Sequence, residues 1–266
     1  MLTYEALERG WKAMRRQGLR VREVACEGVA RTLICAEAGS YERPAIHIAA
    51  GVHGDEPAAP WALLSIAADG LLDTQTFSFR LWACTNPSGY RLGTRENAEG
   101  RDINRSFSRG GKTPEARAMI VANRDRKFVL SIDLHEDFET EGFYCYEPIV
   151  NGSAMFGKRI IEALDDAALP VERIDEGFDL AYPPGVPLPP IERGHVMPDV
   201  HVEASFGDER PLNPFMLRGA ARRVLTFESP RRQPWETRIA IHRVALTTAI
   251  TYLARQAYAA PNVKVH

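Results

Sequence analysis

The sequence predicts an α/β domain in which a largely parallel sheet is covered by helices on both faces. Near-continuous apolar runs, as expected for strands buried on both faces, recur at 45–49, 79–84, 128–135 and 223–230. Segments with helical patterns separate most of these runs, which favours parallel pairing. The length of 266 residues and the apolar share of 45% suit a single domain over 1–266.

The N-terminal elements predict one edge of the sheet. Apolar side chains at helical spacing over 4–16 indicate a helix, within residues 1–20, that docks on the core. Strand-like runs follow at 21–26 and 31–36. The short, glycine-containing connection between them predicts an antiparallel hairpin.

Helices are predicted between and after the central strands. Thr113 followed by Pro114 is typical of a helix start. The other predicted helices span about 56–71, 153–167 and 237–256.

Two irregular regions stand out. Thr85–Tyr90 predicts a turn from its Asn-Pro pair and its glycine, and polar sequence continues to about Lys112. A loop of this length in a compact domain usually serves a function. A proline-rich stretch within 176–222 predicts a variable substrate-loop region, which either closes over a site or forms a stiff surface excursion.

Charge and composition exclude several classes of protein. A formal charge of −2 gives no electrostatic footprint for nucleic acid. No apolar run approaches the ~20 residues that span a bilayer, and the N-terminus lacks the order of a signal peptide. We therefore expect a cytoplasmic protein with no membrane partner and with its four cysteines as buried thiols. Nothing in the sequence predicts the oligomeric state.

Polar residues follow or end the four apolar runs. These are His53 with Glu56, then Asn86, His135 and Glu228. In a parallel sheet the carboxyl ends of the strands gather at one edge, where sites form. We therefore expect these side chains to converge.

Two histidines and a glutamate from this set suit a zinc ion. The three ligands would be His53, Glu56 and His135, with one Zn²⁺ per chain. The fourth coordination position of the ion would stay open for water, as in catalytic zinc sites. Glu228 is then available as general base for that water. Asp133 either orients an imidazole from the same face of the strand or is an ordinary strand-end carboxylate.

The long loop supplies cations. Arg95 can stabilise a tetrahedral oxyanion, where one donor is worth ~3–4 kcal/mol. Arg105, with Asn104, can hold a substrate carboxylate. Loop arginines alone are more often solvent-exposed, but the neighbouring metal ligands favour these roles.

The motifs and their order resemble the zinc carboxypeptidase (M14) superfamily. The branch most similar is the small bacterial one near the murein-peptide amidases, followed by the succinylglutamate desuccinylase/aspartoacylase group. The motifs are His53-Gly-Asp-Glu56, Asn86-Pro-Ser-Gly89, Gly93-Thr-Arg95-Glu-Asn97, Gly100-Arg-Asp102-Ile-Asn104-Arg105, Asp133-Leu-His135 and Thr226-Phe227-Glu228.

This resemblance implies a fold and a set of roles. The implied fold is a mixed, mostly parallel sheet of about eight strands between helices. The implied roles are zinc ligands for His53, Glu56 and His135, general base for Glu228, oxyanion stabilisation for Arg95, and binding of the terminal carboxylate for Asn104 and Arg105.

Some residues depart from the family pattern. The mobile tyrosine of digestive carboxypeptidases has no counterpart among these motifs, and Tyr182, beside the proline-rich stretch, is the candidate for it. Glu136 and Asp137 are expected to be surface charge rather than to bind an amine or a second cation. His195 and His201 either line the substrate pocket or are ordinary histidines.

Three functions compete. The leading one is a metallocarboxypeptidase that cleaves an amide bond next to a free carboxylate in a small peptide. The second is a deacylase of N-acyl amino acids, which usually needs a β-rich C-terminal domain, whereas the residues after Glu228 predict one helix. The third is a zinc-binding protein without activity that keeps the fold to bind peptides and would have no need of a general base.

Overall fold

A computed structural model describes residues 2–150, 155–173, 189–199 and 210–259 of the chain. The strands are β1 (Arg20–Ala25), β2 (Thr32–Ala38), β3 (Ala45–Ala50), β4 (Ser78–Trp82), β5 (Leu130–Asp137), β6 (Tyr144–Tyr146), β7 (Ile191–Glu192), β8 (His195–Val196) and β9 (Val224–Pro230). They form one sheet in the order β1-β2-β4-β3-β5-β9-β6-β8-β7. The four central strands, β4, β3, β5 and β9, are parallel, and β1 and β2 form the antiparallel edge. The predicted mixed, mostly parallel sheet is confirmed.

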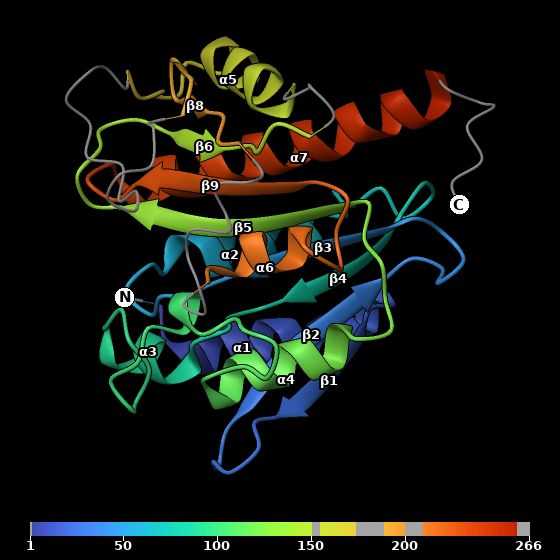
Figure 1. Cartoon of the computed structure of the whole chain (residues 1–266), viewed down its shortest axis with the longest axis vertical. Helices are drawn as coiled ribbons and strands as arrows, with labels where there is room; N and C mark the ends of the chain where they lie inside the picture. The colour runs from blue at the N-terminus through green and yellow to red at the C-terminus, as the bar shows by residue number, and fades with distance from the viewer. Residues whose placement is uncertain (1, 151–154, 174–188, 200–209, 260–266) are drawn as a thin grey trace.

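Helices cover both faces of the sheet (Figure 1). The α-helices are α1 (Tyr4–Ala13), α2 (Ala58–Ala68), α3 (Pro87–Leu92), α4 (Pro114–Asn123), α5 (Phe156–Asp166), α6 (Leu212–Leu217) and α7 (Trp235–Ala259), with short 3₁₀ helices η1 (Met14–Gln17) and η2 (Ile103–Arg105). One apolar core contains side chains of α1, α2, α5 and α7, and a second contains side chains of α4 and α6.

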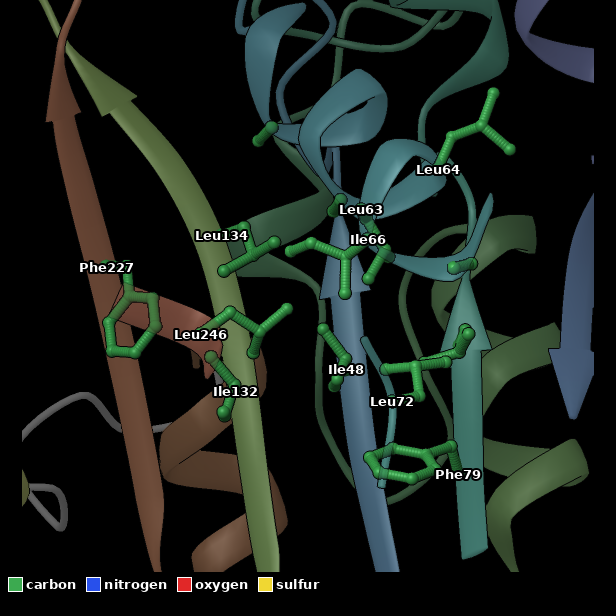
Figure 2. Close-up of a cluster of buried hydrophobic side chains, with 14 of the residues drawn as sticks. Ile48, Leu63, Leu64, Ile66, Leu72, Phe79, Ile132, Leu134, Phe227 and Leu246 are labelled. Atoms are coloured by element: carbon green, nitrogen blue, oxygen red, sulfur yellow. The ribbon is translucent and has the colours of Figure 1, made fainter. Parts of the chain in front are cut away.

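Alternation along the strands divides their side chains between these two cores. Ile48, Ile132 and Phe227 face α2 and α7, where Leu63 and Leu246 pack among them (Figure 2). Neighbouring residues on the same strands face α4 and α6, because successive side chains of a strand point to opposite faces. Burial on both faces explains why the strand sequences are nearly continuous apolar runs.

The α4/α6 face of the central strands holds most of their polar side chains. Five polar residues are sequence neighbours of first-core residues on the same strands, so their side chains point to the opposite face of the sheet. They are His47, Ser131, Asp133, His135 and Glu228. Three of these, Asp133, His135 and Glu228, line one cavity at the carboxyl end of the parallel strands. The fold therefore places its reactive groups where open α/β sheets form sites.

The structure differs from the sequence prediction at a few elements. The predicted turn at Thr85–Tyr90 is wrong from Pro87 onward, where α3 begins, because Asn86 caps this helix by accepting a hydrogen bond from the Gly89 backbone N–H at 2.8 Å. The strands β6, β7 and β8 and helix α6 were not predicted. Tyr182 and His201 lie outside the described residues.

The four cysteines are buried free thiols, as predicted. Among the described helices, none combines the length and apolarity that crossing a membrane requires.

Candidate active site

The turn between β3 and α2 places two of the predicted metal ligands. Gly51 has a φ of +64°, which a residue with a side chain rarely adopts. At Gly54 a Cβ atom would lie 1.9 Å from the carbonyl carbon of Gly89 in α3. These two glycines allow a tight turn pressed against α3, and His53 and Glu56 are buried within it.

The neighbouring strands supply the other two groups. His135 and Glu228 are directly paired positions of β5 and β9. Both point to the α4/α6 side, next to the end of β3. Four of the residues expected to converge therefore do so, in one cavity of about 410 Å³.

The ligand atoms of His53, Glu56 and His135 converge on one point. His53 Nδ1 lies 2.5 Å from Glu56 Oε1, and His135 Nδ1 lies 3.1 Å from Glu56 Oε2. The two Nδ1 atoms are 3.3 Å apart. Such close approach of two imidazole nitrogens and a carboxylate suits a shared cation, and these residues form a possible metal-binding group in the described part of the chain.

Two aspartates face the outer nitrogens of the imidazoles, Asp133 within hydrogen-bonding distance and Asp102 slightly beyond it. His135 Nε2 lies 2.9 Å from Asp133 Oδ2, and His53 Nε2 lies 3.5 Å from Asp102 Oδ1. A carboxylate at Nε2 keeps the proton there and leaves the Nδ1 lone pair free for a metal. The donor set therefore fits a divalent cation, and the orienting role considered for Asp133 agrees with this geometry.

The local electrostatics also favour a cation. Burial disfavours a charged imidazole, yet the negative charges of Asp133 and Glu56 outweigh it and raise the pKa of His135 well above the usual range. Burial, together with Glu56 and Asp137, raises the pKa of Glu228 to about 8. A bound divalent cation would lower the pKa of Glu228 again, towards the range of a base that works near neutral pH.

Asp102 lies at the site, although the sequence analysis assigned it no role. Its Oδ2 accepts hydrogen bonds from Arg95 Nε and Nη2 at 3.1 and 3.0 Å, while Oδ1 faces His53. Arg95 Nη1 thereby comes within 3.3 Å of His53 Nδ1. One carboxylate therefore positions both a metal ligand and the arginine beside it.

Asn104 and Arg105 lie on η2 and line the same cavity. Asn104 Oδ1 accepts a hydrogen bond from the Leu212 backbone N–H at 2.9 Å, so its Nδ2 remains as a donor. Arg105 Nη1 donates to the Asn104 backbone carbonyl at 3.1 Å. No acidic residue of the described chain forms an ion pair with Arg105, so its positive charge is available for an anion.

Known structures share this architecture. A candidate metallopeptidase from Shewanella amazonensis has a TM-score of 0.73 at 23% identity, covering 94% of this chain and 92% of its own. A metallo-carboxypeptidase from Burkholderia cenocepacia has a TM-score of 0.67 at 18% identity, covering 95% and 69%. Bovine thrombin-activatable fibrinolysis inhibitor, in complex with tick carboxypeptidase inhibitor, has a TM-score of 0.64 at 13% identity, covering 95% and 96%. The chain has the metallo-carboxypeptidase fold. No family model matches the chain, and no curated protein matches its sequence.

Within this carboxypeptidase fold, Asn86 does not join the cavity. Besides capping α3, its Nδ2 donates to the Arg95 backbone carbonyl at 3.0 Å. It therefore positions the loop that carries Arg95 rather than the substrate or the metal.

The structure also places three further residues that the sequence analysis considered. Glu136 is not surface charge, because it is buried and accepts from the Ala58 N–H at 2.8 Å and from Arg238 at 2.7 Å. Asp137 lines the cavity and accepts from the Tyr144 hydroxyl at 2.5 Å. His195 is buried 3.0 Å from Glu147 and does not line the cavity.

Proposed function

We propose that the protein is a zinc-dependent metallocarboxypeptidase that hydrolyses the amide bond next to a free carboxylate in a small peptide. The observation that supports this most strongly is the convergence of the His53, Glu56 and His135 ligand atoms in the cavity that Glu228 and Arg105 also line. A structural metal site would have no need of a carboxylate base and an unpaired arginine at the same place.

Each residue has a separate task in this proposal. Arg105 and the Nδ2 of Asn104 bind the terminal carboxylate, because a guanidinium can bind both carboxylate oxygens at once. Arg95 donates its Nη1 N–H to the carbonyl oxygen as negative charge develops there. Glu228 takes a proton from the attacking water and then transfers it to the nitrogen of the leaving amine.

The metal contributes what side chains cannot. Zinc held by His53, Glu56 and His135 would act as a Lewis acid and would lower the pKa of a water bound to it from ~16 towards ~7.

The role of Arg105 can be tested with a matched pair of substrates. We expect Arg105→Ala to raise KM at least about tenfold for a peptide with a free C-terminal carboxylate, because a charge-assisted hydrogen bond of ~1.5–3 kcal/mol is lost. The amidated form of the same peptide should be a poor substrate for the wild type and should change little in the variant. Steady-state kinetics with products read by mass spectrometry measures both.

Arg101→Ala is the matched control, since Arg101 lies in the same loop but is exposed and donates to the Lys112 backbone carbonyl. Its kinetics should stay close to wild type. Equal losses on the free-acid and amidated peptides in Arg105→Ala would contradict carboxylate recognition. Release of an acyl group in place of a C-terminal residue would favour a deacylase.

A further inference from the structure

A second cavity, of about 340 Å³, lies outside the candidate active site. Side chains of α4 and α6 line it. These two helices lie on the same side of the sheet (Figure 1), the side to which His135 and Glu228 point. Its floor includes Met119, Phe215 and Met216, so its interior is largely apolar. This volume is at the small end of the range for ligand pockets, ~300–1,000 Å³.

Four arginines surround this apolar interior: Arg109, Arg124, Arg210 and Arg218. The described residues that line the cavity include no aspartate or glutamate. The clustering is notable because the chain as a whole has a formal charge of −2. The cavity therefore combines an apolar interior with a strongly positive rim.

The charges of these arginines are not neutralised within the described chain. None of its ion pairs involves Arg109, Arg124, Arg210 or Arg218, and Arg210 Nε is buried without a hydrogen-bond acceptor. Arg80 shows the contrast, since its Nη2 lies 2.6 Å from Glu37. A buried donor without an acceptor is costly, so an anion at the rim would remove that cost.

We propose that this cavity binds a small amphiphilic anion, with a short apolar body in the interior and a carboxylate or phosphate head at the arginines. An apolar ligand without charge would leave Arg210 Nε without an acceptor. A small inorganic anion would leave the interior empty of apolar contact. Only a ligand with both parts matches the arrangement of lining residues.

Helix α6 connects this cavity to the candidate active site. Leu212 and Met216 line the arginine-rimmed cavity, whereas Asn213 and Pro214 of the same helix line the cavity with the metal ligands. The helix has only six residues, so a ligand that moves one of its faces also moves the other.

A buried chain of hydrogen-bonding groups runs between the same two cavities. Asn123, at the arginine-rimmed cavity, has its Nδ2 3.4 Å from His47 Nε2, and His47 Nδ1 lies 2.9 Å from Ser131 Oγ. Ser131 Oγ donates to Asn213 Oδ1 at 3.0 Å, and Asn213 Nδ2 donates to Thr226 Oγ1 at 2.9 Å. Asn213 and Thr226 line the active-site cavity. We infer that binding of the anion alters the walls of that cavity.

Calorimetric titration of the zinc-loaded protein tests the binding site. The probes are octanoate and octyl phosphate, each below its aggregation concentration, with octanol, octylammonium and acetate as comparisons. We expect the two anions with an apolar chain to bind at least about tenfold more tightly than the three comparison compounds. Equal affinity for octanoate and octylammonium would overturn the assignment, as would failure of both anionic probes to bind.

Two kinds of variant separate charge from shape. Arg124→Glu combined with Arg218→Glu should lower the affinity for octanoate at least about tenfold, because two positive charges at the rim become negative. Both side chains are exposed, so the fold should tolerate the change. Arg16→Glu, an exposed arginine of η1, is the matched control and should leave the affinity unchanged. Ala220→Leu, which partly fills the cavity, should also weaken octanoate without changing any charge. Undiminished binding in both cavity variants would place the ligand elsewhere.

Transmission through α6 has a readout that does not depend on peptidase activity. Saturating octanoate should shift the side-chain amide resonance of Asn213 in the wild type but not in the Arg124→Glu/Arg218→Glu variant. An unchanged Asn213 resonance in the saturated wild type would contradict the coupling, because spatial connection alone does not establish it.

Discussion

At the scale of single residues, carboxylates outside the ligand set determine how the site is built. Asp133 and Asp102 each face the outer nitrogen of one imidazole, and Asp102 also holds Arg95. The histidines can therefore present Nδ1 to a metal in a fixed orientation. Partners of this kind affect metal affinity although they do not touch the ion.

Asp102→Asn tests this arrangement. The asparagine amide has one oxygen acceptor and no charge, so it cannot interact with both His53 and Arg95 as strongly as the carboxylate does. We therefore expect the zinc affinity to fall about 10–100-fold. Competition with a chromogenic chelator measures the affinity. Asp69→Asn is the control, since Asp69 is exposed and pairs with Arg243 away from the site. An unchanged affinity in Asp102→Asn would remove Asp102 from the site.

The convergence of the candidate site residues in one cavity could be predicted from sequence, whereas Asp102 could not be assigned a role. His53, His135 and Glu228 end or follow apolar runs, so strand geometry alone brings them together. Asp102 belongs to an irregular loop, and its partners depend on how that loop folds. Asp102 caps η2 by accepting a hydrogen bond from the Asn104 backbone N–H at 2.7 Å, and this loop conformation also places its carboxylate beside His53 and Arg95.

At the scale of elements, the contact between the β3–α2 turn and α3 supports the metal ligands. Gly54 meets the backbone of Gly89, and backbone atoms cannot move aside as a flexible side chain can. The turn that contains His53 and Glu56 is therefore held by close packing as well as by hydrogen bonds.

Gly54→Ala should disrupt this contact. The new methyl group would overlap α3, so we expect a loss of about 1–3 kcal/mol in the free energy of unfolding, or more. Denaturant unfolding measures the loss. Gly110→Ala is the matched control, because a Cβ there meets no atom within 4 Å. Equal stability of the two variants would show that the turn can move without cost.

Elements that the sequence did not predict are short or contain proline. β7 and β8 have two residues each, which is too few to show an alternating pattern. Helix α6 contains Pro214, which reads as a helix breaker, yet Pro214 falls in its first turn, where proline is tolerated. The long strands and helices were predicted because their apolar runs or helical patterns extend over enough residues to be recognised.

At the scale of the whole molecule, stability in acid depends on buried neutral histidines. His242 of α7 is fully buried, and neither ring nitrogen has a hydrogen-bond partner. Burial lowers its pKa to about 3. The unfolded chain takes up a proton at His242 below about pH 6.5, whereas the folded chain does not until about pH 3. Stability is therefore lost as the pH falls from about 6.5 towards 3.

His242→Leu should reduce this loss. The difference in free energy of unfolding between variant and wild type should be about 2 kcal/mol more favourable to the variant at pH 5 than at pH 8. The reason is that the unfolded wild type binds a proton at His242 at pH 5, whereas leucine binds none. Urea unfolding at both pH values measures the difference. Thr251→Leu, at an exposed position of the same helix, should show no such pH dependence. The same gain at both pH values in His242→Leu would contradict the low pKa.

The measurement that tests the proposed activity most directly compares the wild type with Glu228→Gln after loading with zinc. Bound metal and loss of the C-terminal residue from a free-acid peptide are measured on the same samples. We expect about one zinc per chain in both proteins, and a kcat lower by ~10²–10⁴-fold in the variant, the usual contribution of a general base. Wild-type turnover by zinc-loaded Glu228→Gln, or failure of the wild type to bind zinc, would contradict the account.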